Sequence, residues 1–281
     1  MKLLRYGPKG KEKPGILDQH GKIRSLAKVI KDIDGAAISP AGLAKLRKVN
    51  VAKLPLVPGK PRIGPCVTGT QKFIAIGLNY ADHAAESGLQ VPPEPLQFAK
   101  YVSCISGPND NVTLPPKSQK GDWEVELGVI IGRKAKNILE ADAMKYVAGY
   151  CVVNDVSERE FQIERAGQWS KGKSYDTFGP IGPWLVTRDE VKDPQNLSMW
   201  LEVNGKRMQD GSTKTMVYGV QHLVAYLSQF VTLMPGDIIA TGTPPGVGMG
   251  MKPPQYLQPG DTMVVCVEGL GVQRQKVVRD R

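Results

Sequence analysis

The sequence predicts an α+β protein in which strands outnumber helices, and two observations support this fold class. Apolar residues follow the alternating or continuous pattern of strands in six segments after residue 120, whereas the helical period is found in three. The chain of 281 residues also contains 31 glycines and 22 prolines, which indicates many turns rather than long helices. The predicted strands are 123–132, 146–155, 182–187, 198–208, 237–243 and 261–269, and the predicted helices are 138–147, 157–166 and 217–231.

The first part of the chain is predicted to form a small N-terminal α+β domain with its linker, residues 1–65. Residues 1–50 are typical of short strands with one or two helices, and the stretch 54–65 is rich in proline and glycine, as linkers are. The remainder, 66–281, is then long enough for one larger domain with its own core.

Local turn and capping residues place further elements in the larger domain. A compact apolar strand at 73–78 is followed by a predicted short helix at 79–88, with Asn79 as a possible N-cap and Gly88 as a stop. Asn204-Gly205 predicts a tight hairpin turn between two strands.

Composition excludes several classes of function. The formal charge is +10, but outside the first fifty positions Lys and Arg alternate with acids and lack interleaved aromatics, so we expect no nucleic-acid partner. No apolar run approaches the roughly 18–20 residues of a membrane span, so we expect no membrane association. The four cysteines show no C-x₂-C spacing, which favours free thiols and a cytoplasmic location.

Three carboxylates suggest a metal site. In the predicted strand, alternation sends Asp122, Glu124 and Glu126 to one face, with neighbouring Cα atoms about 7 Å apart. Asp155 ends the next apolar strand. Three oxygen anions favour Mg²⁺ or Mn²⁺ over zinc, so Glu124, Glu126 and Asp155 are the candidate ligands. The alternative is that the two glutamates form the solvated face of an amphipathic strand.

Two other features could take part in catalysis. His83 and Glu86 are spaced i,i+3 on the short helix, where a carboxylate can orient an imidazole as a general base; the alternative is a surface hydrogen bond. Lys173 precedes a constrained Gly/Pro segment, although an isolated lysine is usually solvated. The glycine-rich stretch 241–248 after a strand could bind an anion through its backbone N–H groups, or it could be an ordinary turn.

Five motifs in this order resemble the fumarylacetoacetate hydrolase family across residues 70–281. They are N-Y-x-x-H-x-x-E (79–86), E-x-E (124–126), N-D-x-S (154–157), K-S-x-D-T-x-x-P-x-G-P (173–183) and T-G-T-P-x-G-V-G (241–248). The resemblance implies a β-roll catalytic domain behind a small N-terminal domain and a homodimer or homotetramer. It also implies residue roles: metal ligands Glu124, Glu126 and Asp155, a water-activating dyad of His83 and Glu86 on a lid, and substrate contacts at Lys173, Thr243, Arg159 and Gln162.

The activity that the resemblance implies is metal-dependent hydrolysis of a small 2-oxo acid. The segments 211–220 and 242–261 resemble hydrolases of 2,4-diketo-3-deoxy-L-rhamnonate, which yield pyruvate and lactate from a sugar acid of the L-rhamnonate or L-fuconate type. The alternatives are an oxaloacetate keto–enol tautomerase, an acylpyruvate hydrolase or a 2-oxo acid decarboxylase. A scaffold protein with a vestigial site is the non-enzymatic alternative, although all the motif residues are present.

Overall fold

Two packed β-sheets and a few short helices make up the protein, which confirms the predicted β-rich α+β class. The computed structural model describes residues 1–86, 88 and 90–280. The large sheet has the strand order β3-β2-β1-β12-β10-β9-β15-β4-β5, with β6 beside β12. Its strands are β1 (Lys2–Tyr6), β2 (Lys13–Leu17), β3 (Ile23–Ser25), β4 (Phe73–Gly77), β5 (Leu96–Lys100), β6 (Ile105–Ser106), β9 (Val125–Ile131), β10 (Val147–Asn154), β12 (Gly179–Thr187) and β15 (Ile238–Ala240).

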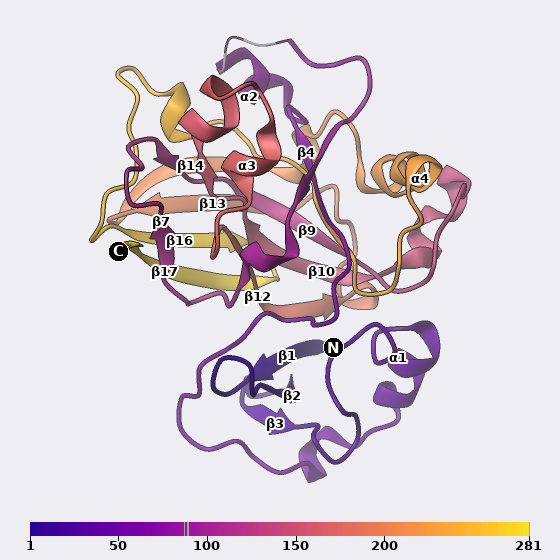
Figure 1. Cartoon of the computed structure of the whole chain (residues 1–281). Coiled ribbons are helices and arrows are strands. Elements are labelled where there is room, and N and C mark those ends of the chain that lie inside the picture. The colour runs from indigo at the N-terminus through magenta and orange to yellow at the C-terminus, as the bar shows by residue number, and fades with distance from the viewer. Residues whose placement is uncertain (87, 89, 281) are drawn as a thin grey trace.

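A smaller sheet, in the order β14-β13-β16-β17-β7, packs against the large one (Figure 1). Its strands are β7 (Val112–Leu114), β13 (Ser198–Val203), β14 (Lys206–Ser212), β16 (Thr262–Val267) and β17 (Gly271–Arg279). Both Asn204 and Gly205 have positive φ, 52° and 79°, which confirms the predicted tight turn between β13 and β14. A pair of two-residue strands, β8 (Gly121–Asp122) and β11 (Ser157–Glu158), lies beside the carboxylates of interest.

The helices are short except for one. The predicted helix at 217–231 is confirmed as α4, whereas 138–147 is a 3₁₀ segment and 157–166 contains a π-helical turn. The helical elements are α1 (Pro40–Arg47), α2 (Ala81–Glu86), α3 (Trp169–Lys173), α4 (Val220–Phe230), η1 (Val51–Lys53), η2 (Val102–Cys104), η3 (Glu140–Tyr146), η4 (Glu160–Glu164), η5 (Arg188–Glu190), η6 (Thr213–Thr215) and η7 (Gly248–Gly250). Positions 87 and 89, on either side of the predicted stop at Gly88, lie outside the described residues.

The N-terminal strands join the same sheet as the catalytic strands. Strand β1 pairs with β12 antiparallel, so β1 to β3 extend the large sheet at one end, and α1 lies beside them (Figure 1). Arg62 in the linker forms an ion pair with Asp110 at 2.6 Å. Strands from both sides of residue 65 belong to the large sheet, and position 281 is not described. The division into domains 1–65 and 66–281 therefore stays a prediction.

Strands β9 and β10 occupy the middle of the large sheet, and every residue in both is buried. Burial on both faces explains their nearly continuous apolar sequence. The predicted strand from 123 breaks at Trp123 and Glu124, and regular pairing resumes at Val125. The solvated-strand alternative for the two glutamates is therefore wrong, since Glu124 and Glu126 are only 5% and 1% exposed.

Candidate metal centre and catalytic site

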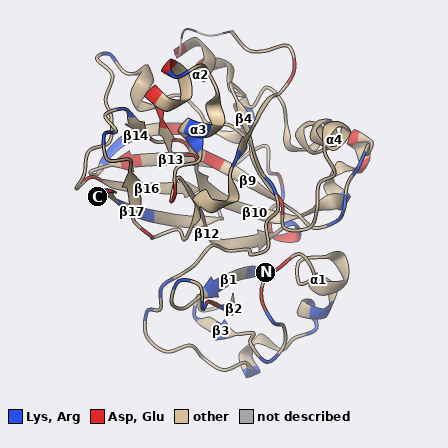
Figure 2. Ribbon diagram, viewed as in Figure 1, with Lys and Arg blue, Asp and Glu red and all other residues tan. Residues whose placement is uncertain are grey.

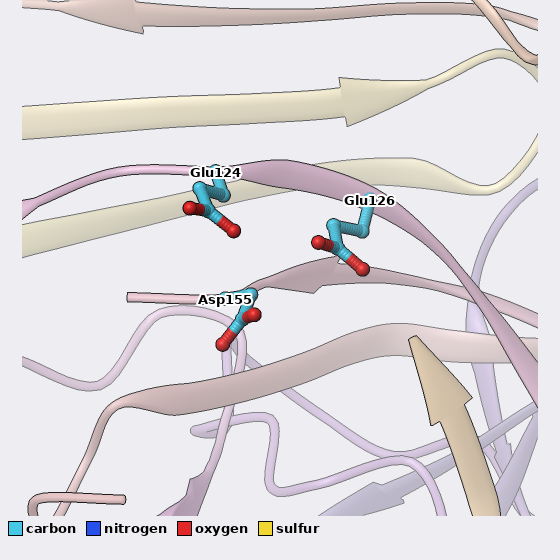
Figure 3. Close-up of side chains that lie close together, drawn as sticks. All are labelled: Glu124, Glu126 and Asp155. Carbon is cyan, nitrogen blue, oxygen red and sulfur yellow. The ribbon is translucent and has the colours of Figure 1, made fainter. Parts of the chain in front are cut away.

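The antiparallel pairing of β9 with β10 brings three carboxylates together. Val125 pairs with Asn154 and Glu126 with Val153, so the start of β9 lies beside the end of β10. Glu124 and Glu126 therefore face Asp155, the first residue after β10, and the three side chains point toward one another (Figure 3). One oxygen from each carboxylate lies within 4.8 Å of the other two. We call these three residues the acidic triad.

The acidic triad fits a divalent cation. All three residues are buried, and in the described part of the chain no basic side chain forms an ion pair with Glu126, which accepts one hydrogen bond from the Gly242 N–H at 2.8 Å. Burial, followed by the negative charges of Asp155 and Glu124, raises the pKa of Glu126 well above the ordinary value. A cation bound between the three carboxylates would relieve that repulsion, and oxygen donors favour a hard ion.

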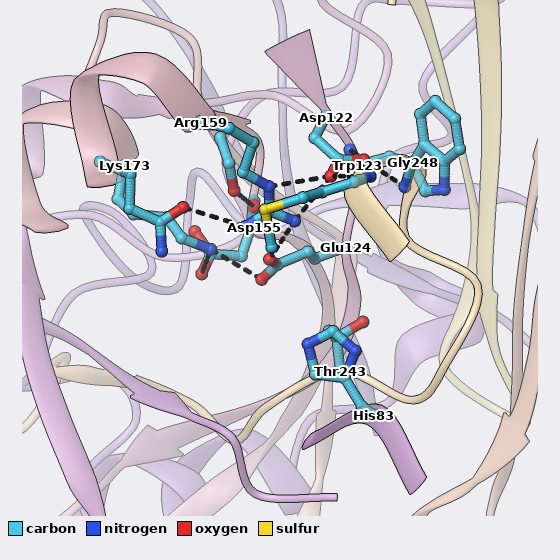
Figure 4. Close-up of polar contacts among 12 residues, drawn as sticks. His83, Asp122, Trp123, Glu124, Asp155, Arg159, Lys173, Thr243 and Gly248 are labelled. Carbon is cyan, nitrogen blue, oxygen red and sulfur yellow. Dashed lines mark hydrogen bonds and ion pairs between the residues drawn. The ribbon is translucent and has the colours of Figure 1, made fainter. Parts of the chain in front are cut away.

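Three buried basic side chains surround two members of the acidic triad. The Lys173 Nζ lies 2.7 Å from Glu124 Oε2 and 2.9 Å from Asp155 Oδ2, and the Lys100 Nζ lies 2.5 Å from Asp155 Oδ1. Arg159 contacts Glu124 at 2.8 Å (Figure 4). Burial raises the pKa of Glu124, but the charges of Lys173 and Arg159 outweigh burial and lower it to about 2. We call Lys100, Arg159 and Lys173 the basic trio.

The charges of these buried groups match a monoanionic ligand once a divalent cation is present. With all carboxylates ionised, as they would be around a bound cation, the acidic triad and the neighbouring Asp122 carry four negative charges, and the basic trio carries three positive charges. The sum of −1 becomes +1 with a divalent cation and zero with a bound monocarboxylate. Charge neutrality inside a buried site lowers the cost of desolvation, so the site suits a metal together with a 2-oxo carboxylate.

Lys100 is a site residue that sequence reasoning missed. It ends β5 and is 2% exposed, and its ammonium group also donates to the backbone carbonyl of Lys173. It therefore ties Asp155 to the end of α3, which carries Lys173. In the sequence, Lys100 is visible only as a lysine at the end of the short segment that forms β5. An isolated lysine at such a position is usually solvated, so the sequence did not mark Lys100 as a site residue.

Replacing Lys100 with methionine should destabilise the protein. The substitution keeps the volume but leaves a buried carbonyl and one oxygen of Asp155 without their donor. Breaking a buried ion pair on one side typically costs about 3–5 kcal/mol, so the free energy of unfolding in the absence of metal should fall by about that amount. Denaturant titration measures it, with Lys136→Met as a control, since Lys136 is exposed and its hydrogen bond within the described residues goes to the Gln229 carbonyl. Equal unfolding free energies for the two variants would contradict this role.

His83 and Glu86 form a pair on α2 that faces the same cavity. The Nδ1 atom of His83 lies 3.3 Å from Glu86 Oε2, and Glu86 accepts hydrogen bonds from the Gly246 N–H at 2.9 and 3.1 Å. His83 lines the cavity together with Glu124 and Glu126, and Figure 4 shows it on the side opposite Lys173. The glycine-rich stretch 241–248 thus holds the carboxylates of Glu86 and Glu126 through its N–H groups.

The expected substrate contacts all line this cavity, but they differ in how many of their polar atoms already have hydrogen-bond partners in the protein. The Thr243 hydroxyl donates to the Val125 carbonyl at 2.9 Å and accepts from Gln209 at 2.7 Å, so it has little capacity left. Gln162 accepts from Arg159 Nη1 at 3.0 Å. The Nη2 atom of Arg159 lies 2.8 Å from Asp122 Oδ2 and 2.8 Å from Glu124 Oε1, so these two carboxylates hold its guanidinium group.

Asp122 was expected on the same face as Glu124, and their carboxylates lie close together, because the Arg159 Nη2 atom is 2.8 Å from each. The Asp122 carboxylate also accepts from the N–H groups of Gly248 and Met249, at 2.7 and 3.0 Å, and from Arg159 Nε at 2.8 Å. Asp122 therefore orients Arg159 and fixes the loop 246–249.

The chain thus belongs to a class of β-rich proteins with two packed sheets and a buried carboxylate cluster beside a His–Glu pair. Within it, the model of the family described as fumarylacetoacetate (FAA) hydrolase, C-terminal, matches residues 72–278. The chain belongs to this family. A protein of Burkholderia orbicola (strain MC0-3) that carries the name of a hydrolase is 64% identical over 277 residues, 98% of each chain.

Solved structures agree with this assignment. The fumarylacetoacetate hydrolase from Exiguobacterium antarcticum has a TM-score of 0.89 and 34% identity, with all of both chains covered. The maleylpyruvate hydrolase from Sphingobium sp. SYK-6, solved with manganese (II) ion and pyruvate, has a TM-score of 0.83 and 29% identity, again with full coverage. In the described part of this chain, no helix has the length and apolar character needed to span a membrane.

Proposed function

We propose that the protein hydrolyses the C3–C4 bond of a 2,4-dioxo acid and releases pyruvate. The observation that carries this proposal is one cavity lined on one side by Glu124 and Glu126 and on the other by His83, whose partner is Glu86. The cavity therefore combines a place for a 2-oxo carboxylate with a candidate base for water. Membership of the family and the hydrolase names of relatives support the same reaction type.

In this proposal the His83 imidazole removes a proton from water, and Glu86 holds the ring in the orientation that this transfer requires. The water oxygen then bonds to the C4 carbonyl carbon. When the C3–C4 bond breaks, its electron pair leaves with the pyruvyl fragment, which takes up a proton at C3, and C4 becomes a carboxylic acid. Arg159 and Lys173 lie where they can offset the charge that develops on the 2-oxo acid half.

Mg²⁺ is the proposed resident ion and Mn²⁺ the alternative, held by the acidic triad. Such an ion would act as a Lewis acid that polarises the 2-oxo acid half. The oxygen donors support either ion, and the manganese in the Sphingobium maleylpyruvate hydrolase supports a divalent metal in the family.

For the distal half of the substrate we propose a short hydroxyacyl group, as in a 2,4-diketo-3-deoxy acid of the L-rhamnonate or L-fuconate type, which would yield lactate. The support for this half comes from the side chains that line the metal cavity. Its non-polar wall can receive a terminal methyl group but offers no cation to a second carboxylate, and it consists of Ile76, Leu78, Phe98, Ile163, Trp169 and Met249.

A substrate panel tests this function. Pyruvate release should require a divalent ion, stop with EDTA, and be fastest with the L-rhamnonate-type acid, slower with acetylpyruvate and slowest with maleylpyruvate, whose distal carboxylate would face the non-polar wall. The panel also includes oxaloacetate, and the absorbance of its enol form measures its tautomerisation. Keto–enol tautomerisation needs the same 2-oxo acid site, but it forms no bond between the substrate and water. Tautomerisation without pyruvate from any 2,4-dioxo acid would reject hydrolysis, and no turnover at all would favour the scaffold alternative.

We also propose a cytoplasmic homodimer, which could pair further into a homotetramer. All four cysteines are free thiols, as in a reducing compartment. The large sheet ends at β5, and the residues that follow it expose apolar surface at Tyr101 and Val102, 61% and 45% exposed. Sedimentation velocity should give about twice or four times the chain mass of 30.6 kDa, and a monomer would contradict the proposal.

A further inference from the structure

A second concave site lies between the N-terminal part of the chain and the catalytic part. It is a groove of about 350 Å³ between α1, the end of β9, the start of β10 and the residue after β12. This volume falls in the usual range for small-ligand sites. The groove shares no lining residue with the metal cavity. Its lining consists of Ile38, Pro40, Leu43, Arg47, Gly132, Arg133, Lys145, Val147, Ala148 and Arg188.

The charged side chains that line this groove are all basic. Arg47 comes from α1, Arg133 follows β9, Lys145 belongs to η3 and Arg188 begins η5. Four separate segments of the chain thus each contribute one cation, and no acidic residue is among the lining residues. Figure 2 shows basic segments on α1 and on the neighbouring part of the catalytic region.

Nearby acids neutralise only half of this charge. Arg47 forms an ion pair with Asp189 at 3.2 Å, and Lys145 forms one with Asp142 at 2.5 Å. Among the described residues no acid forms an ion pair with Arg133 or Arg188. The groove therefore carries an uncompensated charge of +2.

We propose that this groove binds a small organic phosphate, a dianion with a compact apolar body. Two unpaired guanidinium groups match a phosphate in charge, and their planar forks can each donate two hydrogen bonds to its oxygens. The Arg133 guanidinium lies over the Tyr146 ring, 6.0 Å from its centroid, which limits the positions of its side chain. The apolar floor of Leu43, Val147 and Ala148 is suited to the organic part of the ligand.

Such a ligand would link the N-terminal part to the catalytic part. Arg47 and Leu43 belong to the first, whereas Arg133 and Arg188 belong to the second. A ligand that contacts both binds only the folded arrangement, so it should raise the temperature of thermal unfolding in a concentration-dependent way. This readout does not depend on catalytic turnover.

The test compares two double variants with equal loss of charge. Arg133→Gln/Arg188→Gln removes the unpaired guanidinium groups, and Lys134→Gln/Lys136→Gln removes two exposed lysines next to Arg133 that do not line the groove. Calorimetry and thermal shift are measured with phenyl phosphate and with inorganic phosphate, at constant ionic strength and saturating Mg²⁺. We expect saturable binding to the unmodified protein and the lysine variant, with phenyl phosphate the tighter ligand, and at least about tenfold weaker binding to the arginine variant.

Three outcomes would overturn the proposal. Saturable binding could be missing for both probes, or both double variants could lose affinity equally, which would indicate a general charge effect. Binding could also survive fully in the arginine variant, which would place the phosphate at the metal instead, because that variant leaves the acidic triad intact. Unfolding temperatures without ligand verify that each variant is folded.

Discussion

Replacing Glu126 with glutamine is expected to abolish turnover and to weaken metal binding by more than about 100-fold. Loss of a group that merely orients a metal ligand typically lowers metal affinity by about 10–100-fold. Glu126 is itself a proposed ligand, so its replacement should lower the affinity further. Glutamine keeps the shape and can still accept the Gly242 hydrogen bond, so only the charge is removed. Calorimetry with Mn²⁺ measures the affinity, and pyruvate release measures turnover.

The control for this variant is Glu202→Gln, the same chemical change on β13, where Glu202 pairs with Arg207 at the surface. Its activity and metal affinity should equal those of the unmodified protein. If Glu126→Gln also retained both, the assignment of the acidic triad would be wrong. The circular dichroism of both variants should be unchanged, because glutamine fits the site of Glu126 without a change in volume.

The same substitution should change how stability depends on pH in the metal-free protein. Burial and the charges of Asp155 and Glu124 raise the pKa of Glu126 above the ordinary 4.5. The folded state then holds a proton that the unfolded state releases, so stability is fully present below pH 4.5 and is lost as pH rises toward the raised pKa. Glu126→Gln should remove this loss, and thermal unfolding between pH 4.5 and 8 measures the difference.

Replacing His83 with alanine is expected to slow hydrolysis by roughly 10²–10⁴-fold, the usual contribution of a general base. His83 is outside the acidic triad, so affinity for Mn²⁺ should be retained. The loss should appear in kcat, with little change in KM, because the imidazole acts on water rather than holding the 2-oxo acid. Steady-state kinetics of pyruvate release separate the two constants.

His222 gives a matched control for this variant. It also pairs with a carboxylate, Glu140, at 3.0 Å, but on the exposed side of α4 and outside the metal cavity. His222→Ala should therefore leave kcat unchanged. Normal hydrolysis by His83→Ala would point to another base, and an equal loss in both variants would indicate a general structural effect.

How far the sequence predicts this site depends on the kind of residue. Glu124, Glu126 and Asp155 could be found because the two glutamates alternate with apolar residues and Asp155 ends an apolar run, where a buried carboxylate needs a partner. Lys100 could not be found, because its position at the end of β5 shows nothing of Asp155, which lies 55 residues away in sequence. The hydrogen bond from Gln209 of the smaller sheet to the Thr243 hydroxyl was also beyond sequence reasoning, because the two residues belong to different parts of the fold.

By itself, the sequence determined the strand-rich class, the hairpin at Asn204-Gly205, the long helix at 217–231 and the identity of the candidate ligands, since all of these depend on local patterns. The pairing of β9 with β10 decided that the carboxylates meet, and the packing around them decided that Lys100, Arg159 and Lys173 balance their charge. Only the fold could decide this, because burial and Coulomb interactions depend on distances between segments that are far apart in the chain.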